Sequence, residues 1–269
     1  MKKKGIALVE RQYLFPFVLI TSLFFLWGFA HAILDVLNKH FQELLTITRT
    51  HSAMIQATMY MGYFIMAIPA GLFINRHGYR RGVVLGLLLY GTGSLLFIPG
   101  QYIASFNMFL FSLFVIGCGL TFLETAANPY VTELGARETA ASRLNFAQSF
   151  NGLGCIFAPI LTGLLLFSDD DKGAGGNVAL PYAVMGVVVL LAALAFVRVP
   201  LPEIPHEEEV DSEGRRVSLW SHKLFVFGLA ALFAYEVAEI SINSFFINYV
   251  TEVGWMNARD ASLVLSFGG

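Results

Sequence analysis

Four carboxylates lie inside stretches of sequence that are otherwise apolar: Asp35, Glu124, Glu236 and Glu239. A charge at the centre of a membrane costs roughly 2.5–3.5 kcal/mol on insertion scales, so such residues usually face a cavity and function there. Burial also favours the neutral, protonated form of a carboxyl group. Glu124, which follows an uncharged stretch of the chain, is therefore a candidate proton carrier. The alternative is a glutamate that hydrogen-bonds a neighbouring helix and never titrates.

Aromatic and amide side chains accompany these carboxylates at helical spacing. Trp27 precedes the first of them in the same apolar stretch. Tyr60 and Tyr63 are three residues apart, as are Gln148 and Asn151, so each pair shares a helix face. Carboxylates beside aromatic rings suit sugars, which present hydroxyl groups and apolar ring faces. Packing and helix–helix hydrogen bonding are the alternatives.

The composition indicates which elements position these residues. Of the 269 residues, 56% are hydrophobic and only 13% are charged, whereas soluble domains carry about 25% charged residues. A soluble fold could not cover its surface with so few ionisable groups, but lipid requires no polar cover. The sequence has no basic face that would indicate nucleic-acid binding. The two cysteines, Cys118 and Cys155, are not spaced as metal ligands are. We predict no metal and no cofactor.

Uncharged stretches long enough to span a membrane recur along the chain. They are Tyr13–Leu34, Ser52–Asn75, Gly82–Leu123, Leu144–Ser168 and Gly173–Val197. The third is too long for one helix, and we divide it at the turn signal Pro99-Gly100-Gln101. A seventh span covers Leu224–Val250, with an eighth starting near Ala261. The predicted fold is all-α and polytopic, with Asp35 near the outer end of the first helix, where exposure to water is its alternative role.

Lysine and arginine in the loops orient these helices. With the N-terminus inside, the inner segments hold 13 of the 17 basic residues and the outer segments hold 4. The N-terminus is therefore predicted to be cytoplasmic. The first apolar stretch is too long for the core of a signal peptide and is taken as a retained helix.

The chain is predicted to divide into three parts. Residues 1–199 form an N-terminal six-helix bundle, residues 200–223 a polar cytoplasmic loop, and residues 224–269 the incomplete start of a C-terminal bundle. Six helices, a long loop and further helices are typical of transporters built from two parallel repeats, with the substrate between them. Because the sequence stops early in the eighth span, we expect a truncated chain. Its seventh helix, with few partners, should pack loosely or only against the cavity face.

The loop after the second span carries a recognisable pattern, Gly71-Leu72-Phe73-Ile74-Asn75-Arg76-His77-Gly78-Tyr79-Arg80-Arg81. It resembles the G-x-x-x-D-R-x-G-R-R loop of the major facilitator superfamily, with asparagine in place of the usual aspartate. The resemblance implies a gating loop at the inner surface. Its residues would be Gly71, Asn75, Arg76, Gly78, Arg80 and Arg81.

A finer resemblance is to the fucose:proton symporter branch, which includes glucose/galactose permeases. The matching segments are Phe24–Gly28, Gly62–Phe64, Leu123–Pro129 and Arg143–Asn151. The resemblance implies sugar binding and coupling for Asp35 and proton transfer for Glu124. It also implies that Gln148 and Asn151 lie in the cavity and that Glu239 matches a family glutamate, while Glu236 has no counterpart. The asparagines that precede the aspartate in fucose permeases are replaced here by His31, Ala32 and Leu34.

The sequence thus predicts proton symport of a neutral monosaccharide, of the fucose, glucose or galactose type, by alternating access. Proton coupling is assigned to Glu124 and Asp35, and substrate binding to Asp35, Gln148, Asn151, Tyr60, Tyr63, Trp27 and Glu239. The first six helices contain no lysine or arginine that would suit an acidic substrate. Partners would be the sugar, protons and the lipid bilayer of a bacterial inner membrane, with a monomeric full-length protein. Open alternatives are a superfamily transporter of another small neutral or drug-like substrate, and a non-transporting fragment. No nucleophile–base pair or H-E-x-x-H motif suggests an enzyme.

Overall fold

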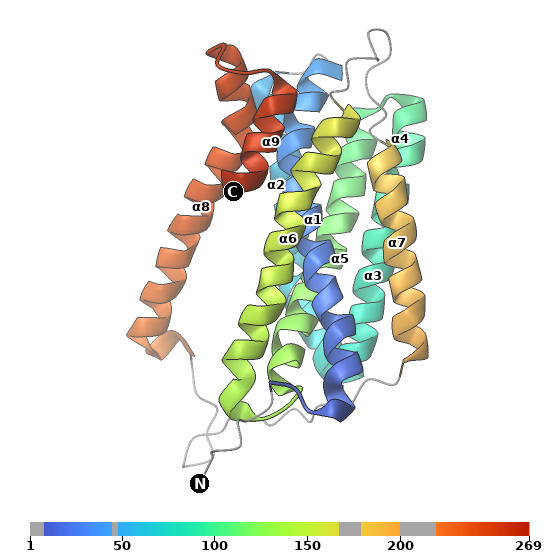
Figure 1. Ribbon diagram of the computed structural model, residues 1–269, viewed down its shortest axis with the longest axis vertical. Coiled ribbons are helices and arrows are strands. Elements are labelled where there is room, and N and C mark those ends of the chain that lie inside the picture. The colour runs from blue at the N-terminus through green and yellow to red at the C-terminus, as the bar shows by residue number, and fades with distance from the viewer. Residues whose placement is uncertain (1–7, 45–47, 167–178, 200–218, 269) are drawn as a thin grey trace.

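The structure is a computed structural model that describes residues 8–44, 48–166, 179–199 and 219–268 (Figure 1). The described residues form nine α-helices and confirm the predicted all-α fold. Their bounds are α1 (Leu14–Leu44), α2 (Arg49–His77), α3 (Tyr79–Leu95), α4 (Phe97–Ile103), α5 (Phe106–Glu133), α6 (Ala140–Leu166), α7 (Ala179–Arg198), α8 (Lys223–Glu252) and α9 (Ala258–Gly268). The predicted loop over 200–223 falls mostly outside the described residues.

Within the described chain, six helical stretches are long and apolar enough to cross a membrane. They are Arg11–Leu37, His51–His77, Tyr79–Ile103, Phe106–Glu133, Ala179–Arg198 and Lys223–Glu252. α6 is not among these six, and it begins with polar residues. It nevertheless packs along α1 within the bundle (Figure 1). The arrangement is that of a polytopic membrane protein.

The first helix is longer than the predicted Tyr13–Leu34. α1 continues through Asp35 to Leu44, so this carboxylate lies nine residues before the helix end, about 13.5 Å along the axis. Asp35 nevertheless lies two residues before the end of the apolar span Arg11–Leu37, so its position near the outer end of that span stays a prediction. A criterion based on uncharged residues ends a helix at the first carboxylate, although the helical backbone continues past a carboxylate whose side chain has partners elsewhere.

The turn predicted at Pro99-Gly100-Gln101 is also misplaced. α3 and α4 meet at Leu96, and the chain turns only at Ala104 and Ser105. Ala104 adopts the left-handed conformation (φ 50°, ψ 40°) that ends helices. The Ser105 hydroxyl accepts a hydrogen bond from the amide of Met108 and caps α5. Pro99 is tolerated because it lies in the first turn of α4, where a helix needs no amide donor.

Close contacts at glycines join the helix pairs of the bundle. A Cβ atom at Gly28 of α1 would lie 2.1 Å from the carbonyl oxygen of Asn151 in α6, and one at Gly154 would lie 2.3 Å from that of Phe25. α2 and α5 meet in the same way, since a Cβ at Gly117 would lie 2.3 Å from the Met59 carbonyl oxygen. Small residues allow membrane helices to approach this closely.

Arg143, near the start of α6, is fully buried. Its guanidinium satisfies carbonyls at the end of α5 and in the chain before α1, and no lysine could reach as many acceptors. Its acceptors are Val131 O (3.0 Å), Ala136 O (3.0 Å), Leu8 O (3.2 Å), Thr139 Oγ1 (2.6 Å) and Thr132 O. This one side chain fixes the lower ends of α1, α5 and α6 together.

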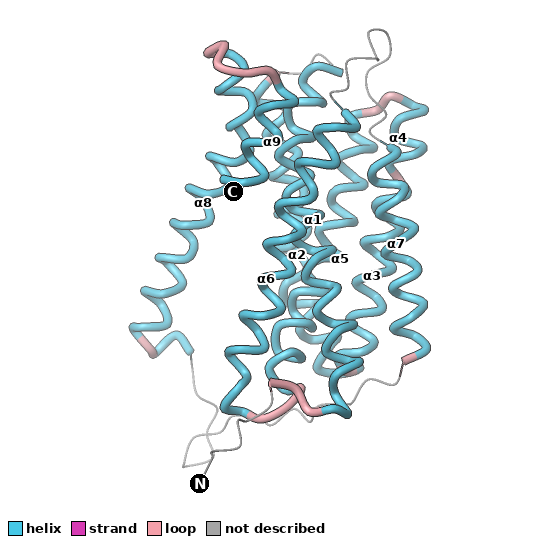
Figure 2. The backbone as a smooth tube through the Cα atoms, viewed as in Figure 1, coloured by secondary structure: helices cyan, strands magenta, loops and turns pink. Residues whose placement is uncertain are grey.

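α8 contacts the bundle over only part of its length. Residues 220–238 are exposed, whereas Ser244, Ile247, Asn248 and Val250 are buried. Figure 2 shows the lower half of α8 standing apart from the other helices, while its upper half lies near α9. The expectation that this helix packs loosely is therefore confirmed for its first half.

We predict that Gly154→Ala destabilises the protein, because the new methyl group would overlap the backbone of α1 at Phe25 and Phe29. Overpacking of this kind costs about 1–3 kcal/mol. Gly152→Ala is the matched control on the same helix, since a Cβ there meets nothing within 4 Å. Thermal unfolding in detergent should show a lower midpoint for the first variant only. Equal midpoints would contradict the close contact.

We further predict that Arg143→Lys destabilises the protein, because a single ammonium cannot replace the donors of the guanidinium and leaves buried carbonyls without partners. Each unsatisfied buried group costs about 1–3 kcal/mol. The control is Arg137→Lys, which changes an exposed arginine in the neighbouring turn. The measurement is the amount of folded protein after heating in detergent. Unchanged stability of the Arg143 variant would refute the capping role.

Candidate functional site

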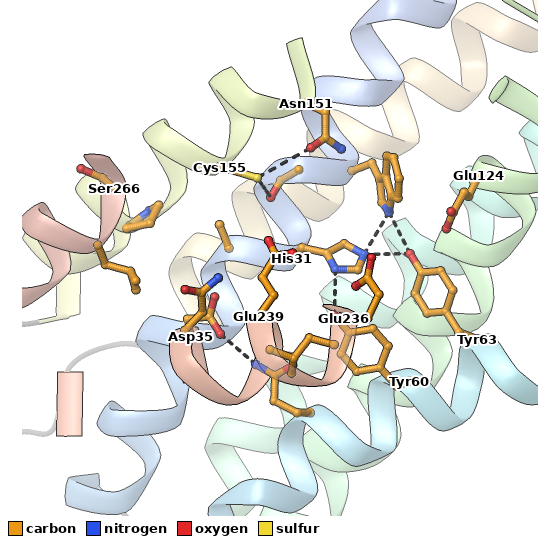
Figure 3. A pocket seen from close by; sticks show the side chains of 18 residues that line it. His31, Asp35, Tyr60, Tyr63, Glu124, Asn151, Cys155, Glu236, Glu239 and Ser266 are labelled. Atoms are coloured by element: carbon orange, nitrogen blue, oxygen red, sulfur yellow. Dashed lines mark hydrogen bonds between the residues drawn. The ribbon is translucent and has the colours of Figure 1, made fainter. Parts of the chain in front are cut away.

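A cavity of about 380 Å³ lies between α1, α2, α5, α6, α8 and α9 (Figure 3). α3, α4 and α7 contribute no residues to it and pack outside this group. The lining comprises Trp27, Gly28, His31, Ala32, Asp35, Gln56, Tyr60, Tyr63, Glu124, Asn151, Cys155, Pro159, Glu236, Glu239, Ile240, Asn243, Leu265 and Ser266. The cavity is thus lined both by helices that precede the α7–α8 connection in the sequence and by helices that follow it.

The four carboxylates singled out from the sequence all line this cavity, from α1, α5 and α8. Its lining residues include no lysine or arginine among the part of the chain that the structure describes. In the same part, no group of three or more acidic, histidine or cysteine side chains is arranged to hold a metal ion. The described lining thus combines four acidic side chains with no basic one, which disfavours an anionic ligand.

Asp35 connects three helices. Its Oδ1 atom accepts a hydrogen bond from Gln56 Nε2 of α2 at 3.0 Å and another from Ser244 Oγ of α8 at 3.3 Å. The carboxylate of Asp35 thus joins α8 to the first bundle in the upper part of the molecule. Neither Gln56 nor Ser244 was singled out from the sequence. Gln56 could have been found, because it lies one helical turn before Tyr60 on the same face.

Four aromatic side chains form one hydrogen-bonded cluster in the cavity wall (Figure 3). Trp27 Nε1 lies 2.9 Å from both His31 Nε2 and the Tyr63 hydroxyl. The Tyr63 hydroxyl is 2.8 Å from the same histidine nitrogen, and Tyr60 OH lies 3.4 Å from His31 Nδ1. The sequence predicted Trp27, Tyr60 and Tyr63 for this site. It did not predict His31, although the residue lies four positions from both Trp27 and Asp35.

Glu124 comes from the middle of α5 and reaches the cavity beside Tyr63 (Figure 3). Among the described residues, its carboxylate makes no hydrogen bond, in contrast to Asp35. A carboxyl group without a fixed partner is free to bind and release a proton. The two carboxylates of the first bundle therefore differ in their surroundings, although the sequence gives them equal chemistry.

The two amides predicted from α6 occupy different places. Asn151 lines the cavity, and its Oδ1 lies 3.7 Å from the Cys155 thiol. Gln148 does not line the cavity, and its Nε2 donates to Asn128 Oδ1 of α5 at 3.5 Å. The prediction that both amides face one cavity therefore does not hold for Gln148 in this structure. Helix–helix hydrogen bonding, the alternative from the sequence, describes its contact.

Glu239 and Glu236 reach the cavity from the part of α8 just below its buried segment. Glu239 is half-buried and Glu236 is exposed. Figure 1 shows the lower half of α8 apart from the other helices.

The residues of the predicted gating loop lie at the junction of α2 and α3, far from the cavity lining. Gly78 turns the chain between the two helices with φ 84°. Arg80 Nε donates to the carbonyl oxygen of Phe196 at 3.1 Å, and its terminal nitrogen donates to that of Val197, at the end of α7. Asn75, Arg76 and Arg81 are exposed, and Gly71 lies in the last turns of α2. Arg80 thus joins the start of α3 to the end of α7 by hydrogen bonds, and the gating role of the loop stays a prediction.

Sequence comparison places the chain among known proteins. The Major Facilitator Superfamily profile matches residues 17–269. The chain is 36% identical over 259 residues to a glucose/galactose transporter of Brucella abortus biovar 1 (strain 9-941), covering 94% of this chain and 63% of that protein. It is 35% identical over 282 residues to an L-fucose-proton symporter of Escherichia coli (strain K12), covering 96% and 64%. It thus spans somewhat less than two thirds of these relatives.

Solved structures agree. The crystal structure of the transporter FucP in the outward conformation superposes with a TM-score of 0.71 and 34% identity, covering 95% of this chain and 68% of that one. A D-xylose-proton symporter shares the fold at 14% identity and a TM-score of 0.65. Proteins of this family are membrane transporters and not enzymes, which agrees with the sequence prediction. The chain is a multi-pass membrane protein of the major facilitator superfamily, in the branch of the fucose:proton symporters and glucose/galactose transporters.

Proposed function

We propose that the full-length protein takes up a neutral monosaccharide, of the fucose, glucose or galactose type, together with protons. The observation that carries this proposal is one cavity that combines four carboxylates with aromatic rings and has no basic residue in its described lining. Sugar hydroxyl groups donate to carboxylates, and aromatic rings accept the apolar face of a pyranose. The names of the sequence relatives support the same substrate class.

We assign the proton carrier to Glu124, whose carboxylate has no fixed hydrogen-bond partner in the described chain. Asp35 is assigned to sugar binding and coupling, since its Oδ1 already joins α2 and α8. Trp27, Tyr60, Tyr63, Asn151 and Glu239 complete the proposed substrate site. Gln148 stays outside it in this conformation.

Alternating access fits the way α8 meets the bundle. Residues 1–199 would form the first six-helix unit, 200–223 a cytoplasmic loop and 224–269 the beginning of the second unit, with the substrate between the two. We also propose that the N-terminus is cytoplasmic and that the membrane is a bacterial inner membrane. We further propose that the full-length protein works as a monomer in the lipid bilayer.

The proton role is tested with Glu124→Gln in the full-length protein, reconstituted into liposomes. The variant should lose sugar accumulation driven by an inward proton gradient, because an amide cannot carry the proton. Counterflow exchange of sugar should survive, since binding and conformational change need no net proton movement. Both are measured as uptake of radiolabelled sugar.

The control for this experiment is Glu133→Gln, which changes an exposed glutamate at the end of the same helix. It should accumulate sugar like the unmodified protein. Full accumulation by the Glu124 variant would refute the proton-carrier role. If the unmodified protein showed neither accumulation nor exchange of these sugars, sugar symport itself would be wrong.

The orientation is tested by cysteine labelling in a variant without Cys118 and Cys155. Arg137→Cys lies in the turn between α5 and α6, and Trp255→Cys in the turn between α8 and α9. Both positions are exposed, at opposite ends of the molecule. A maleimide that cannot cross membranes, added to intact cells, should label only the second. Labelling of the first alone would place the N-terminus outside.

A further inference from the structure

His31 lies in the centre of the cavity wall, and the proposed mechanism leaves it without a role (Figure 3). It stands on α1 one turn after Trp27 and one turn before Asp35. A histidine in the middle of a membrane helix is costly unless it works there. Its contacts determine which nitrogen carries hydrogen and therefore what it can offer a ligand.

The contacts of Nε2 make this nitrogen an acceptor. The indole N–H of Trp27 can only donate, and it lies 2.9 Å from His31 Nε2. The Tyr63 hydroxyl, 2.8 Å from the same nitrogen, can donate to it as well while accepting from the indole. With the indole N–H directed at it, Nε2 fits its contacts as an acceptor, and the Tyr63 hydroxyl can then donate to the same nitrogen.

It follows that Nδ1 carries the hydrogen and that the imidazole is neutral. A second proton on Nε2 would oppose the indole N–H, which has no lone pair in the plane of its ring to accept it. Nδ1 lies 3.4 Å from the Tyr60 hydroxyl, at the long limit of a hydrogen bond. The Nδ1–H group is therefore held in a fixed direction with only a weak partner, and an approaching ligand can replace that partner.

The lining holds other donors, in the amides of Asn151 and Asn243, but an amide group can accept as well as donate, whereas Nδ1–H can only donate. The amide nitrogen of Gln56 is already bound to Asp35 at 3.0 Å. A sugar presents hydroxyl hydrogens, which the carboxylates can bind, and also oxygen atoms that need a donor. A site built to bind a hydroxyl strongly rejects analogues that lack it.

We propose that His31 is a substrate-specificity residue, whose Nδ1–H donates to one hydroxyl oxygen of a neutral sugar. The residue acts through hydrogen bonding alone and takes no part in carrying the proton. Trp27 and Tyr63 are positioning residues, because they fix the tautomer that exposes this donor. This inference rests on the proposed sugar transport and adds the chemistry that selects among sugars.

The test uses analogues of the transported sugar in which one hydroxyl at a time is replaced by hydrogen or by fluorine. Fluorine still accepts a hydrogen bond, and hydrogen does not. In the full-length protein, inhibition of uptake should be several-fold stronger for the fluoro than for the deoxy analogue at the position that faces His31. In His31→Leu this difference should vanish, and the KM for the parent sugar should rise roughly tenfold, because a single neutral hydrogen bond is lost. Proton-driven accumulation at saturating sugar should persist.

Three further variants separate a donor from a merely structural residue. His31→Gln keeps an N–H donor and should restore part of the fluoro–deoxy difference. His31→Phe keeps an aromatic ring beside Tyr60 and Tyr63 but has no donor, so its fluoro–deoxy difference should vanish too. This variant replaces His31→Leu in the test if His31→Leu does not reach the membrane. His51→Leu, which changes an exposed histidine outside the cavity, should retain the full difference.

The outcomes are distinguishable. A fluoro–deoxy difference that persists in both His31→Leu and His31→Phe would overturn the proposal, while leaving sugar transport in place. Loss of proton coupling in these variants, with the difference intact, would also overturn it and make His31 part of the proton path. If the unmodified protein takes up no neutral sugar, the proposed function fails and this inference fails with it.

Discussion

The contact between the backbones of α1 and α6 at Gly28 and Gly154 is the constraint on which the site depends. Gly28 directly follows Trp27 and itself lines the cavity. Because its missing side chain lets the carbonyl of Asn151 approach, the contact that joins the two helices also sets the depth of the cavity. Any side chain here would push Asn151 away from the face that carries His31 and Asp35. Packing and function thus meet at one residue.

A second constraint is the cost of keeping carboxylates away from water, and the cavity meets it in two ways. Asp35 receives donors from Gln56 and Ser244, and these stabilise its charge. Glu124 receives no hydrogen bond in the described chain, and burying its neutral form in an apolar wall costs less free energy than burying its charged form. These different surroundings support the proposal that Asp35 holds the ligand and Glu124 exchanges the proton. The difference comes from their neighbours on α2 and α8.

Much of this could be read from the sequence, because lipid imposes simple rules. A carboxylate in an apolar stretch must face a cavity, and Asp35, Glu124 and Glu239 all do. The wrong predictions concern the rotation of helices and the partners of side chains, which the lipid environment does not determine. Whether Gln148 faces the cavity or α5 depends on the rotation of α6, which is set by packing at Gly154. The proposed tautomer of His31 rests on Trp27, one turn away, and on Tyr63, 32 positions away, and no local pattern contains the second contact.

The link between Asp35 and Ser244 connects the chemistry of the cavity to its shape. Both described donors to this carboxylate bind Oδ1, one from α2 within the bundle and one from α8 beyond it. A hydrogen bond to an ionised oxygen is roughly twice as strong as one to a neutral oxygen. Neutralising Asp35, or engaging Oδ1 with a sugar hydroxyl, therefore weakens the hold on α8 at the end where this helix is buried. The first half of α8 is exposed, so apart from this hydrogen bond the helix is held by its buried segment around Ile247 and Val250. The residue proposed to bind substrate thus also holds α8 against α1 and α2, and under the proposed alternating access this contact would link substrate binding to movement of α8.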